Sequence, residues 1–169
     1  MTCMLFLVRH GIAVDAGPGV ADADRGLTEV GARKVTRIAL GLRRLGVRPE
    51  AILSSPLLRA QQTSEGLQRI LLPGQDVEIY APLAPGHDPS EIIRGLHPRR
   101  GARQLILVGH QPDLGLLVSY LLTGSNTHLG FDFKKGGVAA VELPTLSSRS
   151  IGSLRWFMTP RQLRALAKK

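Results

Sequence analysis

The chain has 169 residues, a length typical of one domain, and 43% of them are hydrophobic, which is enough to form a continuous core. With 22 Lys and Arg against 13 Asp and Glu, the net charge is +9, so the surface should attract phosphorylated or acidic partners. The basic residues are scattered and aromatic residues make up only 4%, which argues against a base-stacking surface for nucleic acid. We therefore expect a single domain spanning 1–169 that binds anions other than nucleic acid.

The first predicted element is a strand over residues 4–8. This apolar run is cut short by Arg9 and His10, and no basic residue precedes it, so neither a membrane span nor a secretory signal is expected. The only cysteine, Cys3, has no internal disulfide partner and is expected to be buried in the strand. These features favour a cytoplasmic protein that does not associate with membranes.

Helical and strand-like segments alternate along the rest of the chain. Apolar residues recur every three or four positions over 28–45, with an N-cap at Thr28 and a stop at Gly46. A short strand over 51–53 leads into a helix over 58–72 that carries Arg59 in its first turn. The remaining expected elements are a strand over 77–80, a helix over 89–96, a strand over 104–108, a helix over 112–122, and two final strands over 138–143 and 154–158.

This alternation predicts an α/β fold, a three-layer α/β/α sandwich with a mostly parallel central sheet. In such sheets ligands bind beyond the carboxyl ends of the strands. His10 and His110 each follow a strand directly, and Arg59 begins the helix after another strand. We therefore expect these three side chains to meet at one edge of the sheet.

The Arg9-His10-Gly11 segment is the first candidate for chemistry. An imidazole can attack phosphorus through one nitrogen while the other nitrogen holds its proton in a hydrogen bond, usually to a backbone carbonyl. Gly11 suits a tight turn and lets a phosphate approach the backbone. A histidine that only caps a strand is the alternative for the tripeptide taken alone.

Phosphoryl transfer also needs positive charge around the phosphate oxygens. Arg9 and Arg59 can each offer forked donors that stay charged, and His110 would be a third donor if it is protonated. Because the sequence contains no obvious metal-binding box, we expect no metal and no cofactor, with side-chain cations taking the metal's place.

Four motifs in order give a specific resemblance. They are Leu7-Val8-Arg9-His10-Gly11, Leu27-Thr28-Glu29-Val30-Gly31, Ser54-Ser55-Pro56-Leu57-Leu58-Arg59-Ala60-Gln61-Gln62-Thr63 and Val108-Gly109-His110-Gln111-Pro112. From Met4 to about Pro160 the chain resembles the histidine phosphatase superfamily, with its phosphoglycerate mutase-like fold, and within it the small SixA-type phosphohistidine phosphatases. The resemblance implies His10 as the phosphorylated nucleophile, with Arg9, Arg59 and His110 completing the phosphate pocket. It also suggests Arg25 as a further phosphate contact.

The chain also departs from larger members of that superfamily, which carry a helical cap and a glutamate that protonates the leaving group. Neither is apparent here. In the matching stretch over 82–88, Asp88 is the nearest carboxyl and His87 the second choice for a proton donor, although a loop or helix-capping role fits both better. A phosphoramidate nitrogen is readily protonated and leaves as neutral imidazole, whereas an alkoxide needs a well-placed acid. An open pocket without a strong acid therefore favours phosphohistidine on a protein.

The leading hypothesis is thus a metal-independent phosphohistidine phosphatase, and the alternative enzyme is a broad-specificity phosphomonoesterase acting on small phosphorylated metabolites. A non-enzymatic alternative is a binding module, which would bind phosphate in the same pocket without catalysing its transfer. Nucleic-acid binding depends on the charge alone and would weaken steeply with salt.

Overall fold

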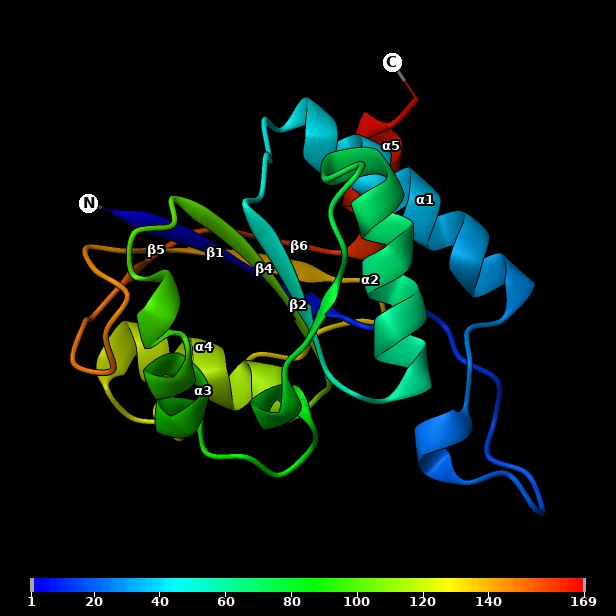
Figure 1. The fold of residues 1–169 in the computed structure, drawn as a ribbon, viewed down its shortest axis with the longest axis horizontal. Coiled ribbons are helices and arrows are strands. Elements are labelled where there is room, and N and C mark those ends of the chain that lie inside the picture. Colours follow the sequence, from blue (N-terminus) through cyan, green and yellow to red (C-terminus); the bar gives the residue numbers. More distant parts are fainter. Residues whose placement is uncertain (1, 169) are drawn as a thin grey trace.

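A six-stranded sheet forms the middle layer of the protein in the computed structural model, which describes residues 2–168 (Figure 1). The strands are β1 (Cys3–Arg9), β2 (Ala51–Ser54), β3 (Glu78–Ile79), β4 (Gln104–Gly109), β5 (Val138–Leu143) and β6 (Ser153–Met158). The helices are α1 (Glu29–Arg44), α2 (Leu58–Leu71), α3 (Pro89–Gly95), α4 (Asp113–Thr123) and α5 (Pro160–Leu166), with short 3-10 turns at Asp22–Asp24, Ala81–Leu83 and His97–Arg99.

The strands lie in the order β3-β2-β4-β1-β5-β6. Strands β1 and β2 run parallel to β4, and β3 runs parallel to β2. Strand β5 is antiparallel to both β1 and β6, so β6 points the same way as β1 and β5 alone is reversed. The predicted α/β sandwich with a mostly parallel sheet and no large cap insertion is confirmed.

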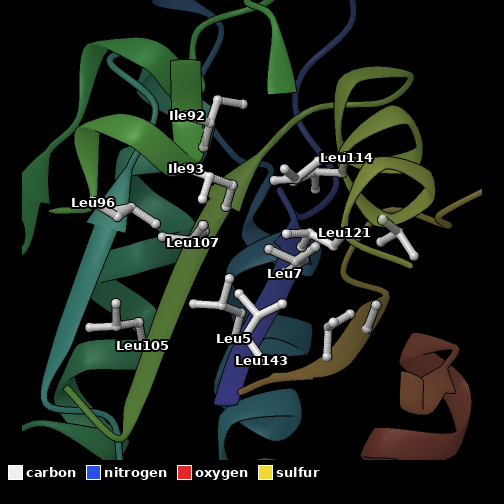
Figure 2. Close-up of a cluster of buried hydrophobic side chains, with 14 of the residues drawn as sticks. Leu5, Leu7, Ile92, Ile93, Leu96, Leu105, Leu107, Leu114, Leu121 and Leu143 are labelled. Atoms are coloured by element: carbon white, nitrogen blue, oxygen red, sulfur yellow. The ribbon is translucent and has the colours of Figure 1, made fainter. Parts of the chain in front are cut away.

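Period-two alternation places the strand side chains on two faces. Leu5 and Leu7 of β1 pack with α3 and α4, as do Leu105 and Leu107 of β4 (Figure 2). Phe6 and Val8 of β1, with Ile106 and Val108 of β4, pack on the other face with α1, α2 and α5. Each residue step along a strand therefore switches the layer that it contacts. Burial in the first cluster raises the pKa of Cys3 to about 11, with a smaller contribution from the charge of Glu50.

The start of α1 fixes the path of the loop that follows β1. As predicted, Thr28 is the N-cap: its Oγ1 accepts a hydrogen bond from the Gly31 backbone N–H at 2.9 Å. The Thr28 N–H donates to the Ile12 carbonyl at 2.9 Å, and a Cβ on Gly31 would lie only 2.1 Å from that oxygen. Gly31 is needed here because the loop crosses the first turn of the helix so closely.

Two elements differ from the sequence predictions. The third strand pairs only over Glu78 and Ile79, because these exposed residues lie at the edge of the sheet and bury no side chain. Helix α5 was not predicted, although Thr159 and Gln162 form a capping box around its first turn. Only Leu163 of α5 is buried, so the segment lacks the apolar repeat on which helix prediction depends. No helix within residues 2–168 is long and apolar enough to cross a membrane.

Candidate active site

His10 and His110 meet at the carboxyl edge of the central strands. His10 follows β1 and His110 follows β4, and their ring centroids are 5.2 Å apart. The His10 N–H donates to the Gly109 carbonyl at 3.1 Å, and the His10 carbonyl accepts from the Gly136 N–H at 3.0 Å. The two histidines are only 7% and 4% exposed, so the backbone of three strand ends holds a nearly buried pair.

The hydrogen bond of the His10 ring selects its tautomer. Nδ1 lies 2.7 Å from the Gly11 carbonyl oxygen, which can only accept, so Nδ1 carries the proton and Nε2 keeps a free lone pair. Gly11 is held in turn by donating its N–H to Thr63 Oγ1 of α2 at 2.9 Å. A Cβ on Gly11 would lie 2.9 Å from Val35 Cγ2, so the close packing of this turn against α1 favours glycine. The geometry leaves Nε2 of His10 ready to act as a nucleophile.

Both histidines are neutral in the free site. Burial lowers the pKa of His10 to about 4; the Gly11 carbonyl opposes this, and the charges of Arg59, Arg9 and Lys135 add to it. Burial also lowers the pKa of His110 to about 3, helped by His10, Arg59 and Arg9. The condition named for His110 as a charged donor, protonation, is therefore not met near neutral pH in the free site, because desolvation and the neighbouring cations disfavour a further positive charge.

These low pKa values link stability to pH. A histidine has a pKa near 6.5 in the unfolded chain, so between about pH 6.5 and 4 the unfolded state binds more protons than the folded state. The free energy of unfolding, measured in urea, should fall by about 1–4 kcal/mol between pH 7 and pH 5. His110→Asn should show roughly half of that loss. Imidazole NMR shifts of His10 and His110 that titrate near pH 6.5 would contradict the prediction.

Ser55 holds the other ring of the pair. His110 Nε2 lies 2.7 Å from Ser55 Oγ, which itself accepts the Leu57 N–H at 3.3 Å. A hydroxyl can donate or accept, and when the Ser55 hydroxyl donates to Nε2 the neutral His110 ring carries its proton on Nδ1. His110 Nδ1 is buried and has no hydrogen-bond partner among residues 2–168. In that tautomer His110 presents a neutral N–H group to the site.

The two predicted arginines approach the site from different elements. Arg9, the last residue of β1, donates from Nη1 to the Phe133 carbonyl, while its buried Nε has no partner in the described part of the chain. Arg59, in the first turn of α2, is buried and donates from Nη1 to the Asp22 carbonyl at 2.6 Å. Its Nη2 binds Asp22 Oδ2 at 2.9 Å. His10, His110 and two buried or half-buried guanidinium groups thus share one edge of the sheet, as predicted.

The two remaining predicted residues lie in different places. Arg25 donates from Nη1 to Asp22 Oδ1 at 2.8 Å and from Nε to the Val14 carbonyl at 2.9 Å, so Asp22 connects it to Arg59. Asp88 is the N-cap of α3 and accepts the Ser90 N–H at 2.7 Å, which with other contacts lowers its pKa. His87 lies 3.5 Å from Glu91. Asp88 therefore has the helix-capping contact that the sequence favoured.

Sequence reasoning missed three contributors to the site. Ser55 and Thr63 lie within the motif over 54–63, but their contacts with His110 and Gly11 depend on the folded arrangement. Asp22 lies in a loop with two other aspartates and no periodic pattern, so no local signal distinguishes it.

The neighbouring hollow is a different feature from the histidine pair. It has a volume of about 450 Å³, lies between α1 and α2, and is lined by none of the four predicted site residues. Its arginines already pair with glutamates, Arg33 with Glu29 and Arg69 with Glu65, so it lacks the uncompensated charge of an anion site. Within residues 2–168, no group of three or more His, Cys, Asp and Glu side chains could hold a metal ion.

Comparisons with known proteins identify the family and the fold of this chain. The family model described as "Histidine phosphatase superfamily (branch 1)" matches residues 5–81. An uncharacterised protein of Picosynechococcus is 38% identical over 136 residues, which cover 79% of this chain and 81% of that protein. The phosphohistidine phosphatase SixA of Escherichia coli K12 is 30% identical over 163 residues, 95% of this chain and 96% of that protein.

A solved structure described as the protein histidine phosphatase SixA complexed with tungstate superposes with a TM-score of 0.82 at 29% identity. The match covers 95% of this chain and 99% of that one. These likenesses extend over nearly the whole chain and support phosphatase activity. The chain belongs to the histidine phosphatase superfamily and, within it, to the SixA type.

Proposed function

We propose that this protein is a metal-independent phosphohistidine phosphatase that works through a phosphorylated His10. The observation that carries the proposal is the His10 ring: Gly11 fixes the proton on Nδ1, and Nε2 is left free beside Arg9, Arg59 and His110. The likeness to SixA, whose name states a phosphohistidine phosphatase, supports the same substrate class.

The reaction takes two in-line transfers. In the first, the lone pair of His10 Nε2 attacks phosphorus, the P–N bond of the substrate breaks, and the leaving imidazole nitrogen takes up a proton. In the second, water attacks the phosphorus of phospho-His10, inorganic phosphate leaves and the neutral His10 ring is restored. Because His10 is already neutral near pH 7, the first step needs no base to activate it.

The donors around His10 would stabilise charge on the transferring phosphoryl group. Arg9 Nε and His110 Nδ1 are buried and have no hydrogen-bond partner within residues 2–168, a costly state for an N–H group that a phosphate oxygen would relieve. Arg59 adds a forked guanidinium from the first turn of α2. We assign these three residues to the phosphate pocket and Arg25 to its rim, where its contact with Asp22 connects it to Arg59.

Ser55 acts in this proposal as a positioning residue for His110. Ser55→Ala removes the hydroxyl that sets the tautomer of His110, so kcat should fall about 10- to 100-fold, as for other residues that orient a site ligand. Ser54→Ala is a matched control, because within residues 2–168 the buried Ser54 hydroxyl hydrogen-bonds only to the Ser55 carbonyl. Nitrogen NMR of His110 should show a changed Nδ1/Nε2 protonation pattern in Ser55→Ala alone. Equal activity of the two variants would remove Ser55 from the mechanism.

The candidate proton donor, Asp88, is a poor acid, which favours phosphohistidine over phosphate esters as the substrate. Asp88 accepts hydrogen bonds at the start of α3 and its pKa is lowered, so its carboxyl is charged near neutrality and poorly suited to give up a proton. A phosphoramidate nitrogen can take its proton from solvent. An alkoxide is a poorer leaving group and needs a positioned acid to protonate it as it departs. We therefore place the broad phosphomonoesterase second.

A substrate panel tests the choice between these two functions. Specificity constants should be compared for a phosphohistidine-carrying protein and for sugar and nucleotide phosphates, with a chelator present throughout. The proposal predicts at least a 100-fold preference for the phosphohistidine protein and no loss with chelator. A preference for the esters would reverse the order of the two functions, and anion binding without turnover of any substrate would indicate a binding module.

The proposal also includes the partner, the cellular compartment and the domain organisation of the enzyme. Its partner is a phosphorylated protein, and we place it in the reducing cytoplasm because Cys3 is buried and has no internal partner. Residues 1–169 act as a single domain, since both hydrophobic clusters are built on the same sheet. The scattered positive charge favours an acidic partner surface over nucleic acid.

A further inference from the structure

Among residues 2–168, Asp22 is the one acidic side chain that forms an ion pair with the arginines proposed for phosphate binding. Its Oδ2 lies 2.9 Å from Arg59 Nη2 and its Oδ1 lies 2.8 Å from Arg25 Nη1. The Asp22 carbonyl also accepts from Arg59 Nη1 at 2.6 Å. One residue therefore occupies both terminal nitrogens of Arg59 and one of Arg25.

This arrangement copies the way in which a phosphate group binds two arginines. Each carboxylate oxygen takes a different guanidinium group, as two oxygens of one phosphate would. Hydrogen bonds from Arg25 and then Arg59 lower the pKa of Asp22, so the group is an anion at neutral pH. A dianionic phosphoryl group would compete with this carboxylate for Arg59, because Asp22 already takes one N–H of each terminal nitrogen and the two anionic groups repel each other.

The Asp22 carboxylate is also able to move away from the two arginines. Its side chain is 61% exposed, whereas that of Arg59 is 8% exposed, so the arginine stays in place while the carboxylate borders solvent. The residue lies on a single 3-10 turn, Asp22–Asp24, that buries none of its side chains. Gly19, three residues earlier, has a φ of +80° that glycine adopts without strain. Moving this carboxylate away from the arginines therefore disturbs no core packing.

We propose that Asp22 is an internal anion that occupies Arg59 and Arg25 in the free enzyme and competes there with the phosphate group of substrate and product. This inference depends on the proposed phosphate pocket. Asp22 weakens the binding of phosphate and helps to expel inorganic phosphate after the second transfer, when the carboxylate returns to the two guanidinium groups. Asp22 is thus a determinant of phosphate affinity and product release.

Asp22→Asn tests the inference because it keeps the shape of the side chain and removes its charge. Binding of inorganic phosphate and of tungstate should be measured by calorimetry, alongside KM, kcat and inhibition by phosphate. The dissociation constants of both anions and KM should fall about three- to tenfold, phosphate should inhibit more strongly, and kcat should not rise. Asp22→Ser serves as a second variant without the charge.

Asp24→Asn is the matched control. It removes the same charge two residues along the same turn, where the side chain forms no ion pair with any of residues 2–168, so its effect on anion affinity should be less than twofold. Anion affinity in both Asp22 variants that is equal to or weaker than in the wild type would overturn the inference. If the wild type binds anions and Arg59→Ala does not, the phosphate pocket is supported even when the inference about Asp22 fails. If Arg59→Ala binds as well as the wild type, the proposed pocket itself fails.

Discussion

Replacement of His10 by alanine is expected to reduce kcat with a phosphohistidine protein by about 10⁴- to 10⁶-fold, to the limit of detection. The loss is this large because the variant lacks the atom that receives the phosphoryl group, so both transfers disappear together. Nε2 of His10 is the neutral nucleophile that the Gly11 carbonyl prepares. Steady-state assays at saturating substrate would measure the effect.

Two controls make the His10 result specific. His97→Ala removes an exposed imidazole just before β4, at the opposite end of the strand from His110, and should leave kcat unchanged. His10→Ala should still bind inorganic phosphate, because Arg9, Arg59 and His110 remain. A variant that keeps more than about 1% of wild-type kcat would exclude His10 as the obligatory acceptor.

Arg59→Ala is expected to lower kcat/KM by about 10³-fold, within the range found when a charged donor to a transferring phosphoryl group is removed. The physical reason is that Arg59 is buried at the start of α2 and brings a permanent positive charge beside two neutral histidines. Arg59→Lys should recover part of the loss, since lysine keeps the charge and lacks the fork.

Arg69→Ala is the matched control for Arg59. It lies on the same helix, is exposed and pairs with Glu65 at 3.9 Å, so its loss should change kcat/KM by less than twofold. Thermal unfolding of all three variants shows whether each is folded, so that a loss of activity in a folded variant can be assigned to the lost charge. Similar activity of Arg59→Ala and Arg69→Ala in folded proteins would remove Arg59 from the phosphate pocket.

Much of the fold and the centre of the site could be predicted from the sequence, because both depend on local periodicity. The alternation of apolar residues fixes which face of β1 and β4 is buried, and caps such as Thr28 fix where helices begin. Ligands bind at the carboxyl ends of the strands in such sheets, and this rule predicts that His10 and His110 lie close together without any knowledge of tertiary contacts.

The remaining features depend on contacts that no local pattern records. The protonation state of His110 follows from burial and from cations on other elements, so the sequence leaves it open whereas the structure indicates a neutral ring near pH 7. The pairing of Asp22 with Arg59 depends on the path of the loop after β1, which has no periodic pattern. Helix α5 escapes prediction because it buries a single leucine, Leu163.

Trapping of the phosphoenzyme shows whether His10 is the residue that accepts the phosphoryl group. The wild-type protein should be mixed with a phosphohistidine substrate labelled on phosphorus, quenched within milliseconds under alkaline denaturing conditions and digested for peptide mapping. We expect an acid-labile, alkali-stable label on His10, approaching one per enzyme molecule and absent from His10→Ala. Turnover at full rate with no covalent label, or with the label on another residue, would contradict it.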